Sequence, residues 1–414
     1  MPLPIFSLML MVFGLTTGEF VIAGILPDVA ADLSVSVAAT GLLVTAYAVG
    51  MIVGGPSITV LTARVARKPL IVALIAVSVI GNLGSAIAPN YPVLLASRFA
   101  AGSVVATFFA VAIATAISMS PPDKHASTVA KVALGMNLGI VLGTPIGTVI
   151  GHNVGWRATF LTVAAVSVAA LLLVLRFVPD QPAATSGPVL SELRVFGDRR
   201  VQWALALTAL GNLGVITVFT YIAPLLTGVS GFTADAVAVL LLVYGVGAVA
   251  GNFLGGWLAD KALMPSLIGL LAALAGVLAL FWLVGDSKAT ATIMVFATGV
   301  LAFAIIPGMQ ARVLTTARSA PTLAIAVNAS GFQLAAAFAG WLGGRVIDSG
   351  LGMRSLYLVG AALTVTGVAV AVHILRRDRA ALRYGEGTAR DRTVPSRFAS
   401  RRIRPVRSGR GWRP

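Results

Sequence analysis

Residues 5–27 read IFSLMLMVFGLTTGEFVIAGILP, an apolar run that contains a single charged residue, Glu19. About 20 apolar residues suffice for a helix to cross a bilayer, so this run predicts a transmembrane helix. Glu19 would lie about 21 Å along its axis at a rise of 1.5 Å per residue, deeper than any other carboxylate of the sequence. Because an ionised carboxylate in hydrocarbon costs a few kcal/mol, Glu19 is predicted to face a cavity or a partner, or to carry a proton. A carboxylate that serves helix packing alone is the alternative.

The composition indicates a polytopic membrane protein. Of the 414 residues, 58% are hydrophobic and 11% are charged, whereas a soluble domain has about 25% charged residues. The chain has no cysteine and three scattered histidines, which excludes disulfides and thiol chemistry and leaves no metal constellation. We find neither a phosphate-cradling glycine-rich loop nor an enzyme constellation, so neither a cofactor nor ATP drive from within this chain is expected.

Hydropathy predicts an all-α integral membrane protein with twelve transmembrane helices. The first span is expected to be retained, because no Lys or Arg precedes it and no small-residue cleavage site follows. The predicted spans are 5–27, 38–61, 69–88, 93–119, 128–150, 157–178, 201–226, 233–258, 264–284, 289–311, 322–344 and 354–375. Residues 179–200, with three prolines and a charged end, are predicted to form a cytoplasmic linker.

Lys and Arg in the loops predict that both termini are cytoplasmic, because cytoplasmic loops carry an excess of these residues. With the N-terminus inside, the cytoplasmic loops and flanks hold twelve of them, and the outer side holds Arg157, Lys288, Arg345 and Arg354. A multi-pass protein of the cell (plasma) membrane is expected.

The net charge of +16 gathers at the C-terminus, where residues 376–414 hold thirteen Arg and three acidic residues, a net charge of +10. This segment also contains Pro, Gly and Ser and few large apolar residues, which predicts a disordered cytoplasmic tail. A basic tail could indicate nucleic acid. We favour contact with anionic lipid of the bilayer and expect no nucleic-acid partner.

An internal repeat divides the chain into two halves. Positions 197 residues apart match without gaps in Pro27/Pro224, Tyr47/Tyr244, Gly50/Gly247, Gly54/Gly251, Phe99/Phe296, Gly102/Gly299, Gly143/Gly340, Gly147/Gly344 and Arg157/Arg354. Two parallel six-helix repeats are the architecture of secondary transporters, which bind substrate at mid-membrane between the halves. We therefore predict an N-terminal six-helix bundle (1–178), the linker (179–200), a C-terminal six-helix bundle (201–375) and the tail (376–414).

The repeat also indicates where proton coupling resides. Glu19 matches Ile216, and Arg98 on the fourth span matches Val295, so both intramembrane charges lie in the N-terminal half. Helical rise places Arg98 about 9 Å and Glu19 about 13 Å below the outer surface, so the two side chains can meet directly or through water. Arg keeps its proton, whereas a buried Glu can take one, which suits a proton switch. A structural or snorkelling Arg98 is the alternative.

The fifth span carries glycines four residues apart, which let helix backbones approach closely. The stripe includes Gly139, Gly143 and Gly147, and Pro145 within it is expected to kink the helix or loosen its hydrogen bonds. We assign these four residues to conformational change, with ordinary glycine-mediated packing as the alternative.

These segments resemble the major facilitator superfamily in its drug/proton antiporter branch with twelve spans. Residues 98–102 are similar to the span-four motif of this family, and residues 139–147 to the span-five motif that marks exporters. Residues 13–28 resemble the sugar-efflux and chloramphenicol-efflux members, most of all the actinomycete chloramphenicol-resistance exporters. The resemblance covers roughly residues 5–375 and implies proton-coupled export of small molecules.

The loop between the second and third spans departs from the family motif Gly-x-Leu-Ala-Asp-Arg-x-Gly-Arg-Lys. Its basic residues are present as Arg64, Arg67 and Lys68, but Ala63 stands in place of the Asp. The second half has the acid as Asp260. The resemblance implies that the basic residues and Asp260 gate the cytoplasmic side, and that the latch of the first half lacks its acid.

Polar and aromatic residues within the spans are the candidates for the substrate cavity, with helix packing as the alternative for each. They are Tyr47, Phe108, Asn137, Phe219, Tyr221, Tyr244, Asn252 and Gln333. Few charged residues accompany them, which favours a neutral or weakly charged amphiphile of drug size.

Three functions are compatible with these patterns. The first is a monomeric exporter that couples protons to the efflux of small, largely apolar molecules by alternating access, with chloramphenicol-like antibiotics as the favoured substrates. The second is a sugar or metabolite exporter of the same fold, which would need more polar groups in the cavity. The third is a channel or membrane sensor, against which Glu19 argues because such a protein needs no titrating carboxylate.

Removal of residues 385–414 is expected to leave transport unchanged, because the repeat and every motif end before this segment. The efflux rate of cells that contain the truncated or the full-length chain at equal membrane abundance tests this. A truncated chain that inserts normally and does not transport would contradict it.

Overall fold

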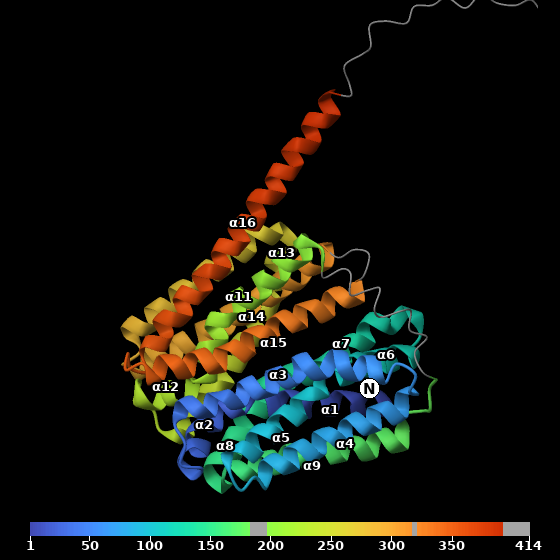
Figure 1. Ribbon diagram of the computed structural model, residues 1–414, viewed down its shortest axis with the longest axis vertical. Coiled ribbons are helices and arrows are strands. Elements are labelled where there is room, and N and C mark those ends of the chain that lie inside the picture. The colour runs from blue at the N-terminus through green and yellow to red at the C-terminus, as the bar shows by residue number, and fades with distance from the viewer. Residues whose placement is uncertain (183–196, 317–320, 392–414) are drawn as a thin grey trace, which may run out of the picture. The chain divides into compact units, whose positions relative to one another are not determined.

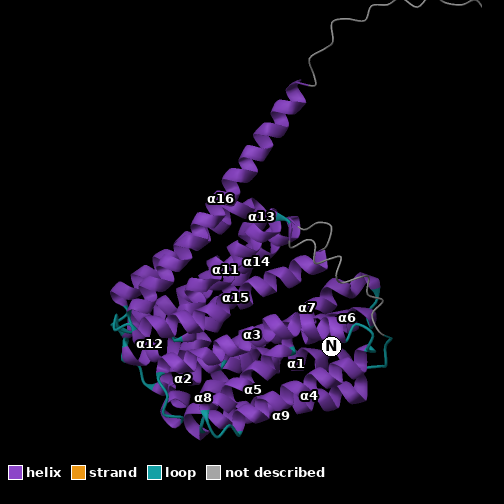
Figure 2. Ribbon diagram, viewed as in Figure 1, coloured by secondary structure: helices purple, strands orange, loops and turns teal. Residues whose placement is uncertain are grey.

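The computed structural model describes residues 1–182, 197–316 and 321–391, except for the side chains of residues 321–327 and 381–391. The described residues form helices joined by short loops, with no strand among them (Figures 1 and 2). Residues 1–372 form one compact unit, and the described residues from His373 on belong to a second. The unit of residues 1–372 contains both sequence repeats.

The first repeat comprises α1 (Leu3–Phe20), α2 (Ile22–Asp32), α3 (Val37–Leu61), α4 (Arg67–Ala86), α5 (Tyr91–Ser103), α6 (Val105–Ser118), η1 (Pro122–Lys124), α7 (His125–Leu138), η2 (Gly139–Gly143), α8 (Thr144–Val154) and α9 (Trp156–Phe177). The second comprises α11 (Arg199–Thr220), α12 (Ile222–Gly228), α13 (Ala234–Val284), α14 (Lys288–Thr316), α15 (Pro321–Asp348) and α16 (Ser355–Asp391).

Each of the twelve predicted spans has a helical counterpart. Ten helices of the described chain, some with a short interruption, are long and apolar enough to cross a membrane. The other two spans come from α13 and α15. In α13, Ala262 (φ −159°, ψ 85°) separates the spans predicted at 233–258 and 264–284, and α15 covers the span predicted at 322–344.

The first span of each repeat is divided into two helices. The break lies at Val21 between α1 and α2, and at Tyr221 between α11 and α12. The equivalent prolines Pro27 and Pro224 follow these breaks, and neither has the N–H that would close its helical turn. The two repeats therefore share this interruption as well as their sequence matches.

The fifth span packs against α1 through its glycine stripe. A Cβ atom built on Gly139 would lie 2.8 Å from Cβ of Thr16, and one built on Gly143 would lie 2.9 Å from Cβ of Thr17. Gly147 repeats the pattern one turn further along, 2.6 Å from Val21. Only glycine lets the two backbones approach this closely, so the stripe fixes the position of α1.

The predicted loosening of the fifth span takes the form of the π-helical turn η2, directly before Pro145. Pro145 has no N–H to donate to the preceding turn. The Thr144 hydroxyl donates over 3.2 Å to the carbonyl oxygen of Gly139, which also accepts the backbone N–H of Thr144 across the π-helical turn. π-Helical turns of this kind are frequent at functional sites.

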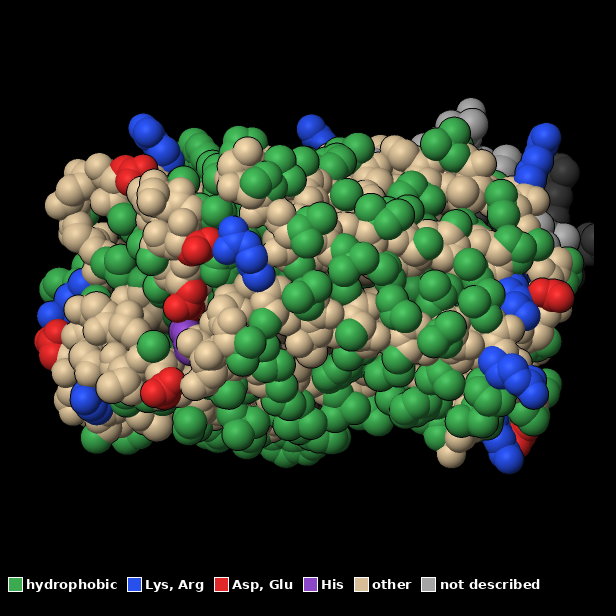
Figure 3. All heavy atoms as spheres, turned by 90° about the horizontal axis from the view of Figure 1, so that it is seen from below, with side chains coloured by type: hydrophobic (Ala, Val, Ile, Leu, Met, Phe, Trp, Pro, Cys, Tyr) green, Lys and Arg blue, Asp and Glu red, His purple; other side chains and the backbone are tan. Residues whose placement is uncertain are grey.

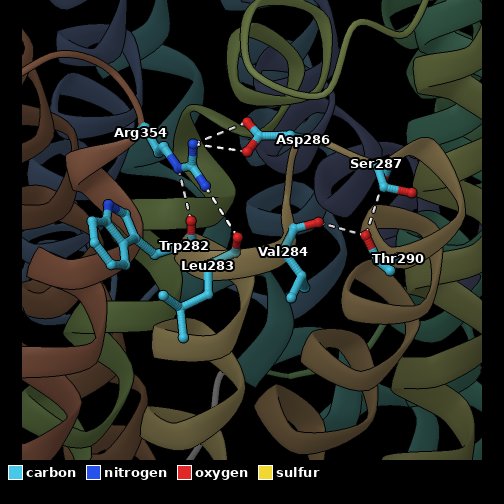
Figure 4. A network of polar contacts seen from close by, with 7 residues as sticks. All are labelled: Trp282, Leu283, Val284, Asp286, Ser287, Thr290 and Arg354. Atoms are coloured by element: carbon cyan, nitrogen blue, oxygen red, sulfur yellow. Dashed lines mark hydrogen bonds and ion pairs between the residues drawn. The ribbon is translucent and has the colours of Figure 1, made fainter.

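Equivalent arginines bind helix ends in both repeats. Arg354 donates to the carbonyl oxygens of Trp282 (2.7 Å) and Leu283 (3.2 Å) and pairs with Asp286 at 2.9 Å (Figure 4). Its repeat equivalent Arg157 donates to the carbonyl oxygen of Ala88 (3.1 Å) and pairs with Asp32. The carbonyls of Trp282 and Leu283 belong to the last turn of α13, which a helix C-terminus leaves without an intrahelical partner, and Ala88 directly follows the C-cap of α4.

Charge is segregated from the apolar middle of the unit. Hydrophobic side chains cover most of the face shown in Figure 3, and acidic and basic side chains gather mainly toward its two ends. At one end, hydrogen bonds from Arg157 and then Trp156 lower the pKa of the Asp32 carboxyl below its ordinary value. This distribution is the one that a bilayer-spanning unit requires.

The start of the predicted tail differs from the expectation. Helix α16 continues to Asp391, so residues 376–391 are helical where the composition predicted disorder. Ala, Leu and Arg, which are good helix formers, dominate residues 376–383 and account for this. The rest of the tail, 392–414, and residues 183–196 of the predicted linker lie outside the described residues.

Gly143→Ala is expected to destabilise the protein by about 1–3 kcal/mol, because the new methyl group overpacks the contact with Thr17. The melting temperature of the purified protein in detergent measures this. Gly276→Ala is the matched control, since a Cβ at that helical position meets nothing within 4 Å. Equal melting temperatures for the two variants would contradict the packing argument.

Candidate functional site

A cavity of ≈ 60 Å³ lies between the two repeats. Its wall consists of Glu19, Phe20, Ile22, Ala23, Val44, Asn212, Val215, Ile216, Phe219, Thr220, Tyr244, Ala302, Phe303, Ile306, Phe332 and Ala336. At about 10–15 Å³ per water molecule this space holds a few waters. A drug-sized substrate therefore requires the cavity to widen.

Repeat equivalence shapes this cavity. The pairs Glu19/Ile216, Ile22/Phe219 and Ala23/Thr220 are each 197 residues apart, and both members of each pair lie in the wall. Positions on α1 and α2 thus face the cavity in the same way as their equivalents on α11. Glu19 is the one charged residue of the wall among the described residues, so its carboxyl faces mostly apolar groups.

The carboxyl of Glu19 contacts the other repeat. Nε2 of Gln333 on α15 donates to Oε1 of Glu19 over 3.0 Å. The two residues are 314 positions apart in the chain, and Gln333 is 7% exposed. The hydrogen bond therefore joins the half that contains the acid to the half that faces it.

Arg98 is fully buried and does not form a direct ion pair with Glu19 in the described structure. Its Nη2 donates to the carbonyl oxygen of Gly18 over 2.6 Å, and its guanidinium carbon lies 4.4 Å from the ring centre of Tyr47 and 5.2 Å from that of Phe160. Cation–π contact offsets part of the cost of burying the charge. Arg98 thus fixes the backbone of α1 immediately before Glu19.

Aromatic rings form much of the cavity wall. The ring centres of Phe219 and Tyr244 are 4.7 Å apart. Phe20 packs edge-on against Phe219 at 5.9 Å, and Phe303 packs edge-on against Tyr244 at 6.3 Å. These contacts hold large apolar surfaces beside the carboxyl of Glu19.

The predicted cavity residues are distributed over several environments. Phe219 and Tyr244 line the cavity, and Gln333 reaches it through Glu19. Tyr47 is buried behind the wall, where its hydroxyl donates to the carbonyl oxygen of Leu15 over 3.2 Å. Tyr221 is buried between helices, where its hydroxyl donates to the carbonyl oxygen of Gly340 over 2.6 Å.

Three further predicted cavity residues also lie outside this wall. Phe108 is fully buried in the hydrophobic core of the first repeat. Asn137 is half-buried on α7, and Asn252 is exposed on α13. Residue type alone does not specify which side of a helix faces the cavity, which is why these positions differ from the expectation.

Sequence reasoning missed several residues of the wall. They include Phe20, Asn212, Ile216, Thr220, Phe303 and Phe332. The repeat held a signal for one of them, since Ile216 is the equivalent of Glu19. No comparable signal existed for Phe303 or Phe332.

We call the contact of α3 with α15 and with the break at Tyr221 the seam. It is formed by Ala38, Gly41 and Thr45 on one side and by Tyr221, Ala337 and Gly340 on the other. α3 and α15 lie side by side here (Figure 1). Thr45 donates to the carbonyl oxygen of Ala337 over 2.8 Å, and the Tyr221 hydroxyl, which donates to Gly340, lies 3.3 Å from the carbonyl oxygen of Ala38. These contacts close the unit at the end that carries α2 and α12.

The residues predicted to gate the cytoplasmic side lie at the opposite end, where Arg67 and Lys68 contact their own repeat and the start of the predicted linker. Arg67 donates to the carbonyl oxygen of Ala114 (3.3 Å) and to Gln181 (3.2 Å), and Lys68 lies 3.7 Å from Asp180. Arg64 and Asp260 are exposed. Their assignment to gating stays a prediction.

The fold and the cavity define a class of protein: a multi-pass membrane transporter built from two helical repeats around a central site. The family model of the Major Facilitator Superfamily matches residues 8–322. The chain belongs to this superfamily, and it is a transporter rather than an enzyme.

Curated relatives span most of the chain. The MFS-type transporter YfhI of Bacillus subtilis is 35% identical over 88% of this chain and 92% of its own length. The chloramphenicol resistance protein of Streptomyces lividans is 34% identical over 78% of this chain and 84% of its own length. Among solved structures, that of a D-xylose-proton symporter is similar in fold, with a TM-score of 0.72 and 16% identity over 89% of this chain and 96% of that one.

Arg98→Ala is expected to abolish transport, because the carbonyl of Gly18 loses its donor and α1 loses its anchor beside Glu19. Arg98→Lys keeps the charge but loses the planar fork, so partial activity is expected. Transport rates at equal membrane abundance provide the measurement. Wild-type activity of Arg98→Ala would show that this anchor is dispensable.

Proposed function

We propose that the protein is a proton-coupled exporter of small, largely apolar molecules, with chloramphenicol-like antibiotics as the favoured substrates. The observation that carries this proposal is the placement of Glu19 in a mostly aromatic and aliphatic cavity wall between the two repeats. Apolar and aromatic surfaces with few polar groups suit ligands of this class. The proton gradient is the energy source, and the working unit is a monomer in the cell membrane.

The mechanism is alternating access. With both termini in the cytoplasm, as the loop charges favour, the seam closes the outer side and the described conformation faces inward. A proton that enters from outside binds Glu19 and favours return of the empty carrier to this conformation. Substrate that binds from the cytoplasm favours loss of the proton and outward release. Arg98 keeps its charge throughout and holds α1 in place.

Similarity supports the substrate class. The relative from Streptomyces lividans is a chloramphenicol resistance protein by name, and it is 34% identical over 332 residues. The cavity also argues against a sugar as substrate, because among the described residues of the wall only Glu19, Asn212, Thr220 and Tyr244 have polar side chains. Asn212 already donates to the carbonyl oxygen of Thr208 over 2.8 Å.

Glu19→Gln is expected to abolish efflux driven by a pH gradient, because the amide cannot exchange a proton while its size and neutral polarity match those of a protonated acid. The measurement is uptake of labelled chloramphenicol into everted membrane vesicles after a pH gradient is imposed. Asn252→Gln is the control, since Asn252 is exposed on α13 outside the cavity wall. Full gradient-driven transport by Glu19→Gln would overturn proton coupling, whereas a wild type that moves other compounds and not chloramphenicol would overturn only the substrate class.

A further inference from the structure

The amide of Gln333 carries an unmatched polar atom. Its Nε2 donates to Glu19, but its Oε1 is buried and accepts no hydrogen bond in the described structure. Leaving a buried acceptor without a donor costs about 1–3 kcal/mol. Rotation of the amide by 180° would place Oε1 against Glu19 and leave Nε2 without its acceptor. Oε1 would gain nothing, because an ionised carboxylate has no hydrogen to donate.

A proton on Glu19 removes this mismatch. A carboxylic acid has one donor and one acceptor, as does the edge of a primary amide that carries the carbonyl oxygen and the N–H cis to it, so protonated Glu19 and Gln333 can exchange two hydrogen bonds. The ionised carboxylate can make only one with the same amide edge. The protonated acid is therefore the better partner for Gln333 in the described conformation.

Gln333 lies where this difference in hydrogen bonding can affect the contact between the two repeats. It lies one helical turn before Ala337 on α15, and Ala337 accepts the hydrogen bond from Thr45 across the seam. Ala336 and Ala337 pack against Ala48 of the first repeat. A bond between Glu19 and Gln333 thus adds to the contacts that hold α15 against α3.

The other ionisable groups around Glu19 are constant by comparison. Arg98 on α5 keeps its charge at every working pH, and Tyr47 on α3 and Tyr244 on α13 have phenol groups, which are neutral below about pH 10. On α4 the nearby polar residue is the uncharged Asn82. Glu19 is therefore the group whose charge changes at this place.

We propose that Gln333 is a positioning residue that couples the proton on Glu19 to closure of the seam. Protonated Glu19 and the Gln333 amide form a two-bond pair between the repeats and hold the conformation described here. Loss of the proton leaves one bond and an unmatched amide oxygen, which favours opening of the seam. This inference rests on the proposed proton coupling and adds the residue that transmits it to the opposite repeat.

The experiment tracks seam opening with a cysteine introduced into this cysteine-free chain. Ala38→Cys places a thiol where the residue is 5% exposed and next to Tyr221 of the other repeat. The rate of its reaction with an impermeant maleimide is measured in proteoliposomes without substrate, from acid to alkaline pH, and corrected for the intrinsic pH dependence of the reagent with a cysteine at exposed Ser34.

In the Ala38→Cys background, acid pH is expected to slow labelling. Glu19→Gln, whose amide can form both bonds with Gln333, is expected to label slowly at every pH. Gln333→Leu is expected to label about 2- to 10-fold faster in acid than its parent, the effect of one net hydrogen bond, and to lose most of the pH response. The double variant Glu19→Gln/Gln333→Leu is expected to regain fast labelling, and Gln333→Met, which is unbranched and tolerated in cores, repeats the test.

Thr45→Val is the matched control, because it removes a seam hydrogen bond that has no titrating partner. It is expected to accelerate labelling equally at all pH values and to retain the pH response. A full pH response in both Gln333 variants, or slow labelling that persists in the double variant, would overturn the role of Gln333 alone. A parent whose corrected rate is independent of pH and unchanged by Glu19→Gln would overturn the underlying proton coupling as well.

Discussion

An ionisable side chain in the wall of an apolar cavity has to be paired, hydrated or protonated, and Glu19 sets this constraint for the helices around it. The buried cation Arg98 donates to the carbonyl oxygen of Gly18 and not to the carboxyl group. The carboxyl of Glu19 instead accepts a hydrogen bond from the neutral amide of Gln333. A direct Arg–Glu pair would hold the acid in its ionised form. An acid bound to an amide can gain or lose a proton without breaking an ion pair, which is what the proposed function requires.

The rest of the architecture separates rigid contacts from those that can open. Within the first repeat, the glycine stripe brings the fifth span within backbone distance of α1, and Arg98 anchors the same helix from α5. Between the repeats, the seam consists of small residues on α3 and α15, the inserted side chain of Tyr221 and a few hydrogen bonds, such as the one from Thr45. Small, smooth surfaces part with less loss of interdigitated packing than large side chains do. The geometry thus favours movement of the repeats as bodies over deformation within one of them.

Much of the fold could be predicted because hydropathy and repetition act along the chain. The twelve spans, the match of Gly143 with Gly340 and the isolated acid Glu19 are all readable from residue order. The hydrogen-bond partners of the site residues could not be predicted, because they depend on the direction in which each side chain points. Nothing in the sequence indicates that Arg98 reaches a carbonyl, or that Gln333 meets an acid 314 residues away. The helical start of the tail was missed because its helix-forming residues were outweighed by its net charge.

The two repeats differ at one pair of equivalent wall positions, and this difference makes the cavity asymmetric. At equivalent places in the wall, the first repeat presents Glu19 and the second presents Ile216. If both positions carried acids, a proton could bind on either side and the two repeats would respond alike. With one acid, the charge changes on one wall only, and the amide that senses it belongs to the opposite repeat. Under the proposed function, a single proton can therefore bias the contact between two bodies that are otherwise built alike, and no second titrating group is needed to link binding to movement.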